Sequence, residues 1–328
     1  MLFLSARDIL RASPMDRAML AAASAFAQLS DANATMPPRT HIALGAEGET
    51  ALIMPALLHG SRAFGVKTLM ITPQNARRGA PILNGVLLLF DTESGQPLCV
   101  LDASALTELR TGAATGVATR VMARKDATTL ALLGAGAQAF CQVWAVCIAR
   151  AIQQIRIYAP TLAHAETLAQ RLSEHGAPIP RDVRVAGSAA EAVHDAFIVC
   201  AATSSSTPVF EDGDLRPGAH INGIGSYTRH MQEIPAETVK RARVVVDQRT
   251  AAWAEAGDLI IPRESGQIDE RAIAGELGEV ILGRTPGRTS PNQITFFKSV
   301  GVAVQDVAAA QATYERAVRE HIGTQIDW

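Results

Sequence analysis

The stretch that decides the fold is residues 130–139, LALLGAGAQA, in which an apolar run ends in Gly134-x-Gly136-x-x-Ala139 and passes directly into a helical pattern. Such a turn suits a dinucleotide. Gly134 permits the tight turn, Gly136 lets the backbone approach a pyrophosphate, and the small Ala139 lets the helix pack on the strand. The N-terminus of that helix offers free N–H groups to the phosphates.

Glycine-rich turns are common, so the pattern around this one matters. After the turn, apolar residues follow at the spacing of a buried helix face: Phe140, Val143, Trp144, Val146 and Cys147. Short apolar strands are expected at Ile155–Ala159, Val183–Ala186, Phe197–Ala202, His220–Ile224 and Val244–Asp247, separated by polar or helical segments such as Leu162–His175 and Ala189–His194. This alternation predicts an α/β fold with a mostly parallel Rossmann sheet; the alternative is a glycine turn in an unrelated α/β domain.

The end of the second strand indicates which dinucleotide is used. An Asp or Glu about 20 residues past the glycines commonly holds the ribose 2′-hydroxyl of NAD. Here Ala159 occupies that place, and no carboxylate follows until Glu166, so nothing repels a 2′-phosphate and Thr161 or His164 can donate to one. The sequence favours NADPH, although a neutral loop also tolerates NADH.

Composition points to small-molecule chemistry. The 328 residues allow about two domains, and 48% hydrophobic residues are ample for sizeable cores. The net charge of −2 has no basic face for nucleic acid and no polybasic segment for a membrane. The apolar start MLFL is too short for a signal peptide, so we expect a cytoplasmic protein. We interpret Cys99, Cys141, Cys147 and Cys200 as reduced structural thiols, and no metal site is predicted.

The region before the fingerprint must have a separate role. A helix is expected at Ser13–Ser30 and strands at Thr50–Leu58, Val66–Ile71 and Val86–Phe90, with a hairpin turn at Asp91–Pro97. This pattern is typical of an antiparallel sheet that supplies substrate contacts. A C-terminal helix from about Val302 is expected to fold back onto this first region.

Four blocks of the sequence resemble the ornithine cyclodeaminase/mu-crystallin family: FGVKTLMITPQN (64–75), LRTGAATGVATR (109–120), the glycine turn, and ITFFKSVGVAVQD (294–306). The resemblance spans nearly the whole chain. It implies a Rossmann NAD(P)-binding domain at residues 116–292, inserted into a discontinuous α+β substrate and dimerisation domain made of residues 1–115 and 293–328. It also implies a homodimer built through the sheet of that first domain.

The resemblance implies that a small α-amino or α-imino acid binds through fixed cations. Arg39, Lys67 and Arg110 match the family's carboxylate-binding residues, with Val300 also near the substrate. A guanidinium can bind a carboxylate with two hydrogen bonds, and a lysine can also supply a proton. Lys67 and Arg110 are therefore the expected catalytic residues, with Lys67 or a bound water as the proton source. Taken singly, such cations are more often solvated surface residues.

The resemblance to the family also implies which residues contact the cofactor, by their matching positions in the motif blocks. We expect them at Arg110, Thr111, Gly112, Gly134, Gly136, Ala137, Gln138, Thr161, Thr203, Ile224 and Ser299. For Thr203, a plain strand-end cap is an equal alternative. We interpret Lys298 as a solvated or interface residue, and His220 and His230 as structural.

The loop at residues 225–233 distinguishes the two reactions of the family, cyclodeamination and imine reduction. Cyclodeaminases carry a catalytic Asp in a Gly-x-Asp-x-Pro-Gly-Lys pattern, but this chain has Tyr227 in place of the Asp and Met231 in place of the Lys. Leu52 stands where cyclodeaminases have a glutamate. Neither a phenol nor a thioether relays an amine proton well near neutrality.

The loop instead resembles the imine-reducing branch, in which Gly-Ser-Tyr/Phe-Thr is followed by Met-x-Glu. The expected function is the reduction of Δ1-pyrroline-2-carboxylate to L-proline, and of the ring larger by one methylene to L-pipecolate. The C=N carbon is expected over the nicotinamide. The alternatives are an ornithine cyclodeaminase, an alanine-type amino acid dehydrogenase, and a non-catalytic NADPH-dependent binding protein.

Overall fold

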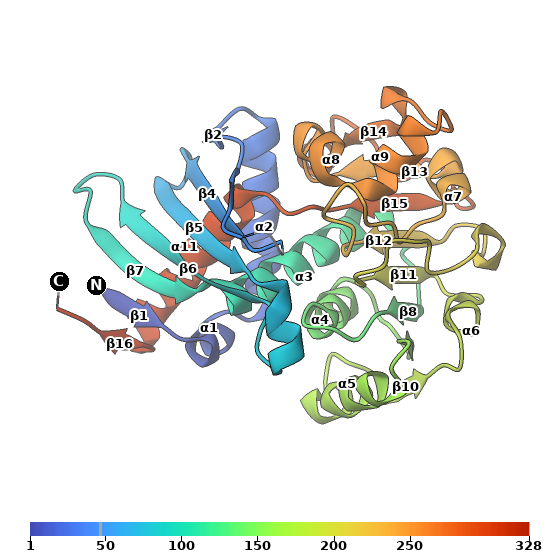
Figure 1. Ribbon diagram of the computed structural model, residues 1–328, viewed down its shortest axis with the longest axis horizontal. Helices are drawn as coiled ribbons and strands as arrows, with labels where there is room; N and C mark the ends of the chain where they lie inside the picture. Colours follow the sequence, from blue (N-terminus) through green and yellow to red (C-terminus); the bar gives the residue numbers. More distant parts are fainter. Residues whose placement is uncertain (46–47, 328) are drawn as a thin grey trace. The chain divides into compact units, whose positions relative to one another are not determined.

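The computed structural model describes residues 1–45 and 48–327 and divides into two compact units. The first unit comprises Met1–Arg110 and Val302–Trp328, and the second comprises Thr111–Gly301. Figure 1 shows the elements of each unit. Among the described residues, no helix is both long enough and apolar enough to span a bilayer.

The first unit is built on a mixed sheet in the order β16-β1-β7-β6-β5-β4-β2, with β3 also paired to β4. Its strands are β1 (Leu2–Leu4), β2 (Ala34–Thr35), β3 (Thr40–Ala43), β4 (Thr50–Leu58), β5 (Ala63–Ile71), β6 (Leu83–Asp91), β7 (Pro97–Asp102) and β16 (Thr324–Gln325). The long strands β4 to β7 are antiparallel, as predicted. The predicted bounds Thr50–Leu58 are confirmed for β4.

Helices α2 (Met15–Ser30) and α11 (Ala303–Glu320) pack against each other, and α11 also packs on β4, β5 and β6. The other helical elements are α1 (Ala6–Ala12), the 3₁₀ turn η1 (Pro73–Arg78) and the first part of α3 (Ala103–Met122). The predicted helix at Ser13–Ser30 begins two residues later, because Pro14 takes the N-cap position in front of Met15. The side chain of Ser13, the C-cap of α1, forms a 2.6 Å hydrogen bond with Thr313 of α11.

Strand β5 places a charged residue on the inner face of this sheet. Its side chains alternate between buried and half-buried, so Gly65, Lys67 and Leu69 share the inner face. A Cβ added at Gly65 would lie 3.1 Å from Cγ2 of Val307, which locates α11 over this face. Lys67 therefore projects into the core beneath α11, where a cation requires a partner.

The second unit is a parallel sheet in the order β10-β9-β8-β11-β12-β15-β13-β14. Its strands are β8 (Thr129–Leu133), β9 (Gln154–Tyr158), β10 (Asp182–Val185), β11 (Ile198–Ala201), β12 (His220–Gly223), β13 (Arg243–Val246), β14 (Ile273–Glu276) and β15 (Thr295–Lys298). The chain order reverses between β8 and β11, the place where dinucleotides bind in doubly wound sheets. The predicted α/β architecture is confirmed.

The crossovers of this unit are short helices. They are α4 (Ala139–Ala149), α5 (Leu162–His175), α6 (Ala189–Val193), α7 (Ala236–Arg241), α8 (Arg249–Glu255), α9 (Gly257–Glu264) and α10 (Leu277–Ile281), with 3₁₀ turns η2 (Asp212–Asp214) and η3 (Glu270–Ala272). The four cysteines of the chain are free and buried, Cys99 in the first unit and the other three in the second.

The unit boundaries differ from the expected domain boundaries of 115/116 and 292/293. The expected second boundary assigned Thr295–Lys298 to the first domain, but this strand pairs in parallel with both β12 and β13. All four of its residues are buried, as is usual for a strand inside a parallel sheet. The chain therefore returns to the first unit only after Gly301.

Candidate active site

The glycine turn of the second unit has the geometry of a phosphate cradle. Gly134 has φ +101°, and a Cβ there would lie 2.5 Å from the carbonyl oxygen of Ala202. A Cβ at Gly136 would meet no atom of the described chain within 4 Å, so the space above it is open. Ala139 is buried as the first residue of α4. These features fit a dinucleotide pyrophosphate.

Three predicted cofactor residues lie beside this turn or after the next strand: Ala137, Gln138 and Thr161. Ala137 is exposed, whereas Gln138, at the N-cap of α4, has a buried Oε1 without a hydrogen-bond partner in the described part of the chain. Thr161 is exposed at the N-cap of α5, beyond the end of β9, and makes no capping bond. All three lie at the carboxyl edge of β8 or β9, where a dinucleotide would need them.

Gly112 serves helix packing. A Cβ at this position of α3 would lie 2.4 Å from the carbonyl oxygen of Cys141 on α4, so only glycine lets the two helices approach this closely. Its neighbour Thr111 is buried. The structure thus gives Gly112 a packing role, and its predicted cofactor contact stays a prediction.

The remaining predicted cofactor residues lie where strands of the second unit end. Thr203 follows β11, Ile224 follows β12 and Ser299 follows β15. The Thr203 hydroxyl accepts a 3.1 Å bond from the Ser205 backbone N–H, so its side chain does form a local turn. Because carboxyl ends of parallel strands lie at one edge of a sheet, these residues share a rim with the glycine turn.

A buried carboxylate that was not predicted, Asp247, holds the turn at 299–301. Its Oδ2 accepts bonds from the Ser299 hydroxyl at 3.0 Å and from the backbone N–H groups of Val300 at 2.8 Å and Gly301 at 2.7 Å. Gly301 has φ +78°, which this tight turn requires. The sequence did contain a signal for this role of Asp247, because an acidic residue ends the apolar strand predicted at Val244–Asp247.

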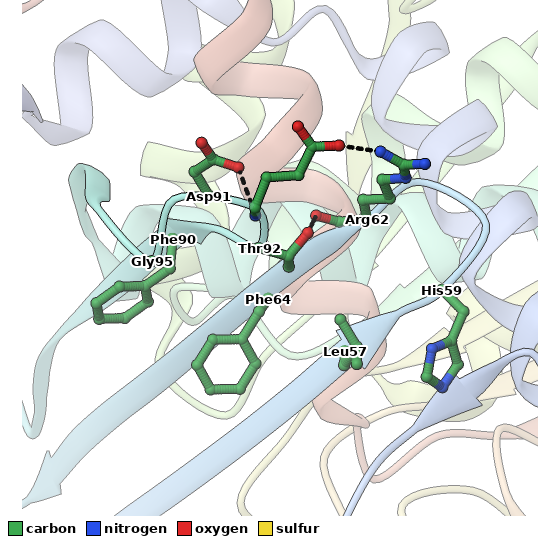
Figure 2. Close-up of a pocket in the computed structure, with 9 residues that line it drawn as sticks. Leu57, His59, Arg62, Phe64, Phe90, Asp91, Thr92 and Gly95 are labelled. Atoms are coloured by element: carbon green, nitrogen blue, oxygen red, sulfur yellow. Dashed lines mark hydrogen bonds and ion pairs between the residues drawn. The ribbon is translucent and has the colours of Figure 1, made fainter.

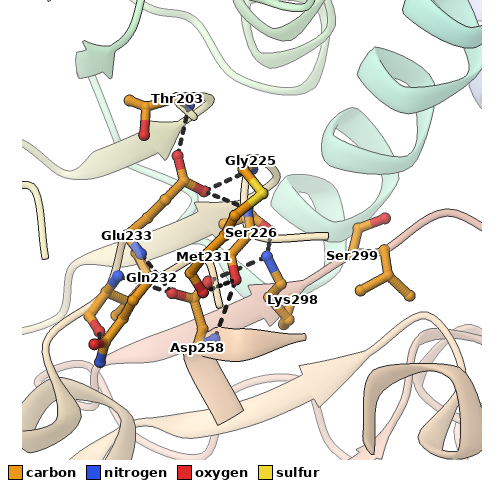
Figure 3. Close-up of polar contacts among 12 residues, drawn as sticks. Thr203, Gly225, Ser226, Met231, Gln232, Glu233, Asp258, Lys298 and Ser299 are labelled. Carbon is orange, nitrogen blue, oxygen red and sulfur yellow. Dashed lines mark hydrogen bonds and ion pairs between the residues drawn. The ribbon is translucent and has the colours of Figure 1, made fainter. Parts of the chain in front are cut away.

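A second unpredicted carboxylate, Glu233, ties the ends of β11 and β12 together (Figure 3). Its Oε1 accepts from the Thr203 N–H at 2.6 Å, and its Oε2 accepts from the N–H groups of Gly225 at 2.6 Å and Ser226 at 3.1 Å. Burial raises the pKa of Glu233, against the opposing charge of Lys298. These bonds hold the loop that carries Tyr227, whose side chain is 47% exposed.

The interpretation of Lys298 as a solvated or interface residue is wrong. Lys298 is fully buried, and its Nζ lies 3.1 Å from Asp258 Oδ2 and donates to the Gly223 carbonyl oxygen at 3.1 Å. Asp258 Oδ1 in turn accepts the backbone N–H groups of Glu233 and Ile234. Lys298 is the fourth residue of a buried strand, so its ammonium can be tolerated only beside such a partner.

In the first unit, the predicted cations Lys67 and Arg110 meet on one oxygen atom. Lys67 Nζ lies 2.7 Å from Asp306 Oδ1, and Arg110 Nε lies 2.9 Å from the same oxygen. Lys67 also donates to the Thr107 hydroxyl at 3.4 Å, and Arg110 Nη1 donates to Gln305 Oε1 at 3.4 Å. This arrangement places two hydrogen-bond-donating cations side by side, as carboxylate binding requires.

The charges around Lys67 and Asp306 shift the pKa of each of these two groups. Burial lowers the pKa of Lys67 to about 7; Asp306 opposes this shift, whereas Arg110 and Arg39 add to it. For Asp306, burial favours the neutral acid, but the positive charges of Lys67 and Arg110 outweigh it and hold the pKa of Asp306 below its usual range. Lys67 can therefore release a proton near neutral pH.

Arg39 completes the set of predicted cations. It is half-buried in the segment that leads into β3, and its charge contributes to the lowered pKa of Lys67. Asp306 itself was missed, although it closes one of the four motif blocks. Nothing in the local sequence distinguishes it from an ordinary acidic residue in the first turn of a helix.

Comparison with known proteins shows what the chain is similar to. The profile of the ornithine cyclodeaminase/mu-crystallin family matches residues 1–321. The chain belongs to this family. The predicted resemblance is therefore confirmed.

Three relatives extend this finding. A Delta(1)-pyrroline-2-carboxylate reductase of Bacillus cereus is 38% identical over all of both chains. The structure of Thermococcus litoralis Delta(1)-pyrroline-2-carboxylate reductase in complex with NADH and L-proline is 36% identical and has a TM-score of 0.95, covering 99% of this chain and 100% of that one. An archaeal alanine dehydrogenase dimer with bound NAD is 32% identical and has a TM-score of 0.92, covering 100% and 99%.

The glycine turn generates a paired prediction. In Gly136→Ala, the new methyl group enters open space, so we expect an unchanged Tm but dinucleotide binding weakened about tenfold or more, because the pyrophosphate can no longer approach the backbone. In Gly112→Ala, the methyl group collides with a backbone carbonyl, so the expected effect is a loss of about 1–3 kcal/mol of stability. Thermal unfolding and calorimetric titration with NADPH measure both effects. Normal binding by Gly136→Ala would place the dinucleotide elsewhere.

Proposed function

We propose that this protein is an NAD(P)H-dependent reductase of cyclic α-imino acids, which converts Δ1-pyrroline-2-carboxylate to L-proline and Δ1-piperideine-2-carboxylate to L-pipecolate. The observation that carries the proposal is the buried pair of cations, Lys67 and Arg110, joined on one oxygen of Asp306. Such a pair suits a small carboxylate. Similarity to Delta(1)-pyrroline-2-carboxylate reductases over the whole chain supports the same substrate class.

The residues of the chain divide the work between binding and proton transfer. Arg39, Lys67 and Arg110 bind the ring carboxylate. Lys67 also donates a proton from Nζ to the imine nitrogen, which makes the adjacent carbon a better hydride acceptor. A bound nicotinamide dinucleotide would supply the hydride. The carbon gains that hydride as the C=N double bond becomes a single bond, and the neutral lysine is reprotonated by water. Because the pKa of Lys67 is lowered to about 7, this proton is available near neutrality.

The loop at 225–233 argues against cyclodeamination. That reaction needs a carboxylate beside the amine, but Tyr227 stands at that place in the motif and is half-exposed. The carboxylate of the loop, Glu233, is buried and accepts three backbone N–H groups, so it is not available to a substrate.

Steady-state kinetics test the proposed function. We expect rapid oxidation of NADPH with both cyclic imines, and a fall in kcat/KM of about 30-fold or more in Lys67→Ala and in Arg110→Ala, because each removes a charged bond to the substrate. The matched control is Arg17→Ala, which removes an exposed arginine of the same unit and should leave kcat/KM unchanged.

Three results would contradict the proposal. Release of ammonia from ornithine without imine reduction would indicate a cyclodeaminase. Preferential use of pyruvate plus ammonia would indicate an alanine-type dehydrogenase. Tight binding of NADPH with no turnover of any of these substrates would indicate a binding protein.

We further propose that NADPH is preferred and that NADH is also used. The support is the loop after β9, where Ala159, Pro160 and the exposed Thr161 present no carboxylate to a 2′-phosphate. Relatives with NADH or NAD bound support a nicotinamide dinucleotide in general. The cytoplasmic location expected from the sequence remains a prediction.

Ala159→Asp tests this preference. A carboxylate at the end of β9 should repel the 2′-phosphate and accept the ribose hydroxyl of NADH, so the ratio of kcat/KM for NADPH to that for NADH should fall about tenfold or more. Ala151→Asp, which places the same charge before β9, is the control and should not change the ratio. A wild-type enzyme that prefers NADH would contradict the proposal.

We also propose a homodimer formed through the outward face of the first unit's sheet. Val86, Met70, Phe64 and Phe90 lie on this face, and Val86 is 43% exposed. Phe64 and Phe90 line an open hollow of about 610 Å³, and their ring centroids lie 5.7 Å apart. Figure 2 shows both rings among the residues that line this hollow. The Arg62–Glu93 ion pair joins the two hairpin turns at its rim. An apolar sheet face of this kind favours association.

Light scattering tests the dimer. Val86→Lys introduces a charge on the proposed interface and should give a monomer, because an unpaired buried charge is costly. Val318→Lys, at an equally exposed apolar position of α11, is the control and should remain dimeric. A monomeric wild type, or a dimeric Val86→Lys, would contradict this interface.

A further inference from the structure

We propose that Asp306 is a positioning residue, which holds Lys67 beside Arg110 and keeps Lys67 in the charged form that can bind the substrate carboxylate and donate a proton. The inference rests on the proposed function for the identity of the substrate. It goes further in assigning the protonation state of the site to a residue that does not itself need to touch the substrate.

Asp306 and Gln305 together hold Lys67 and Arg110 in place, and we call these two acceptors the clamp. Asp306 Oδ1 accepts from Lys67 Nζ at 2.7 Å and from Arg110 Nε at 2.9 Å, so both cations are fixed to one atom. The preceding residue, Gln305, accepts from Arg110 Nη1 at 3.4 Å and from the Val302 N–H at 2.9 Å. Consecutive residues in the first turn of α11 therefore fix the orientation of the Arg110 guanidinium.

The clamp leaves donors available for a ligand. An ammonium has three N–H donors, and those of Lys67 have two acceptors in the described part of the chain, Asp306 and Thr107. Arg110 uses Nε and Nη1, so within the same residues its Nη2 edge has no acceptor. Asp306 supplies one negative charge to the two positive charges of Lys67 and Arg110, and the pair therefore retains an attraction for an anion.

The charged neighbours of Lys67 act in opposite directions. Lys67 is on β5 and is fully buried, which by itself favours the neutral amine. The charged groups that face it are Asp306 on α11, Arg110 on α3 and Arg39 before β3. Of these, Asp306 alone favours the ammonium, and both arginines disfavour it. Without Asp306, burial and both arginines drive Lys67 toward the neutral form, which carries no charge to attract an anion and lacks the proton to be donated.

The test measures ligand binding as a function of pH. The probe is pyrrole-2-carboxylate, a planar analogue of the cyclic imine, titrated calorimetrically into the NADP⁺-loaded protein between about pH 5 and pH 9. Because the charged form of Lys67 binds the anion, affinity should be high at acidic pH and fall about tenfold per pH unit above the pKa of Lys67, near 7. In Asp306→Asn, the midpoint of this fall should move to lower pH by about one unit or more.

Four matched variants separate charge from shape. Asp306→Glu keeps the negative charge and should restore the wild-type midpoint. Thr107→Val removes an uncharged contact of Lys67 and should shift the midpoint little. Arg39→Ala removes a positive charge and should shift the midpoint upward, opposite to Asp306→Asn. Lys67→Arg, which stays charged at all these pH values, should abolish the pH dependence.

Each result decides the proposal. A uniform loss of affinity in Asp306→Asn without a shift in midpoint would mean that Asp306 is merely structural. Failure of the wild type to bind the probe would overturn the inference, because it denies the carboxylate site. If Asp306→Asn does not fold, an unmoved midpoint in Arg39→Ala would overturn it instead. A protein that shows the predicted shifts but does not reduce cyclic imines would contradict the proposed function while leaving the role of Asp306 intact.

Discussion

The first unit depends on a single buried oxygen atom, Oδ1 of Asp306, which accepts hydrogen bonds from both Lys67 and Arg110. Strand β5 directs Lys67 into the core, and an unpaired ammonium there would be strongly destabilising. The carboxylate that neutralises it comes from a segment more than 200 residues away in the sequence. The return of the chain as α11 therefore completes the core of this unit and supplies the partner of Lys67.

The second unit uses buried carboxylates in a different way. Glu233 and Asp247 accept several backbone N–H groups each, where strands end and the sheet no longer supplies acceptors. Each therefore fixes the path of a turn and leaves other side chains, such as Tyr227, on the surface of that turn. The ion pair of Lys298 and Asp258 also fixes the loop at 225–233, because Asp258 accepts the backbone N–H of Glu233. The rim of the sheet is thus shaped by buried carboxylates and their backbone partners.

The local hydrophobic pattern of the sequence predicted much of this architecture, and the predictions that were wrong have physical causes. Strand β4 and the helix at Leu162–His175 were bounded correctly, because their periodicity and ends are local properties. The strand Thr295–Lys298 was expected to belong to the first domain, since nothing in four residues shows which sheet they will join. Lys298 was misjudged for the same reason: lysine is usually solvated, and only its position in a buried strand beside Asp258 reverses that expectation.

The sequence by itself determined the glycine turn and the family and predicted the cations Arg39, Lys67 and Arg110, because glycines and motif blocks carry this information within a few residues. Only the tertiary structure decided the roles of the buried carboxylates: Asp306 pairs with Lys67 and Arg110, and the others hold backbone N–H groups or Lys298. In sequence, Asp306, Asp247 and Asp258 are ordinary acidic residues, and Glu233 is only the last residue of the Met-x-Glu pattern. Their roles follow from burial and from partners brought close by folding, and the energy of a buried charge depends on those surroundings far more than on its neighbours along the chain.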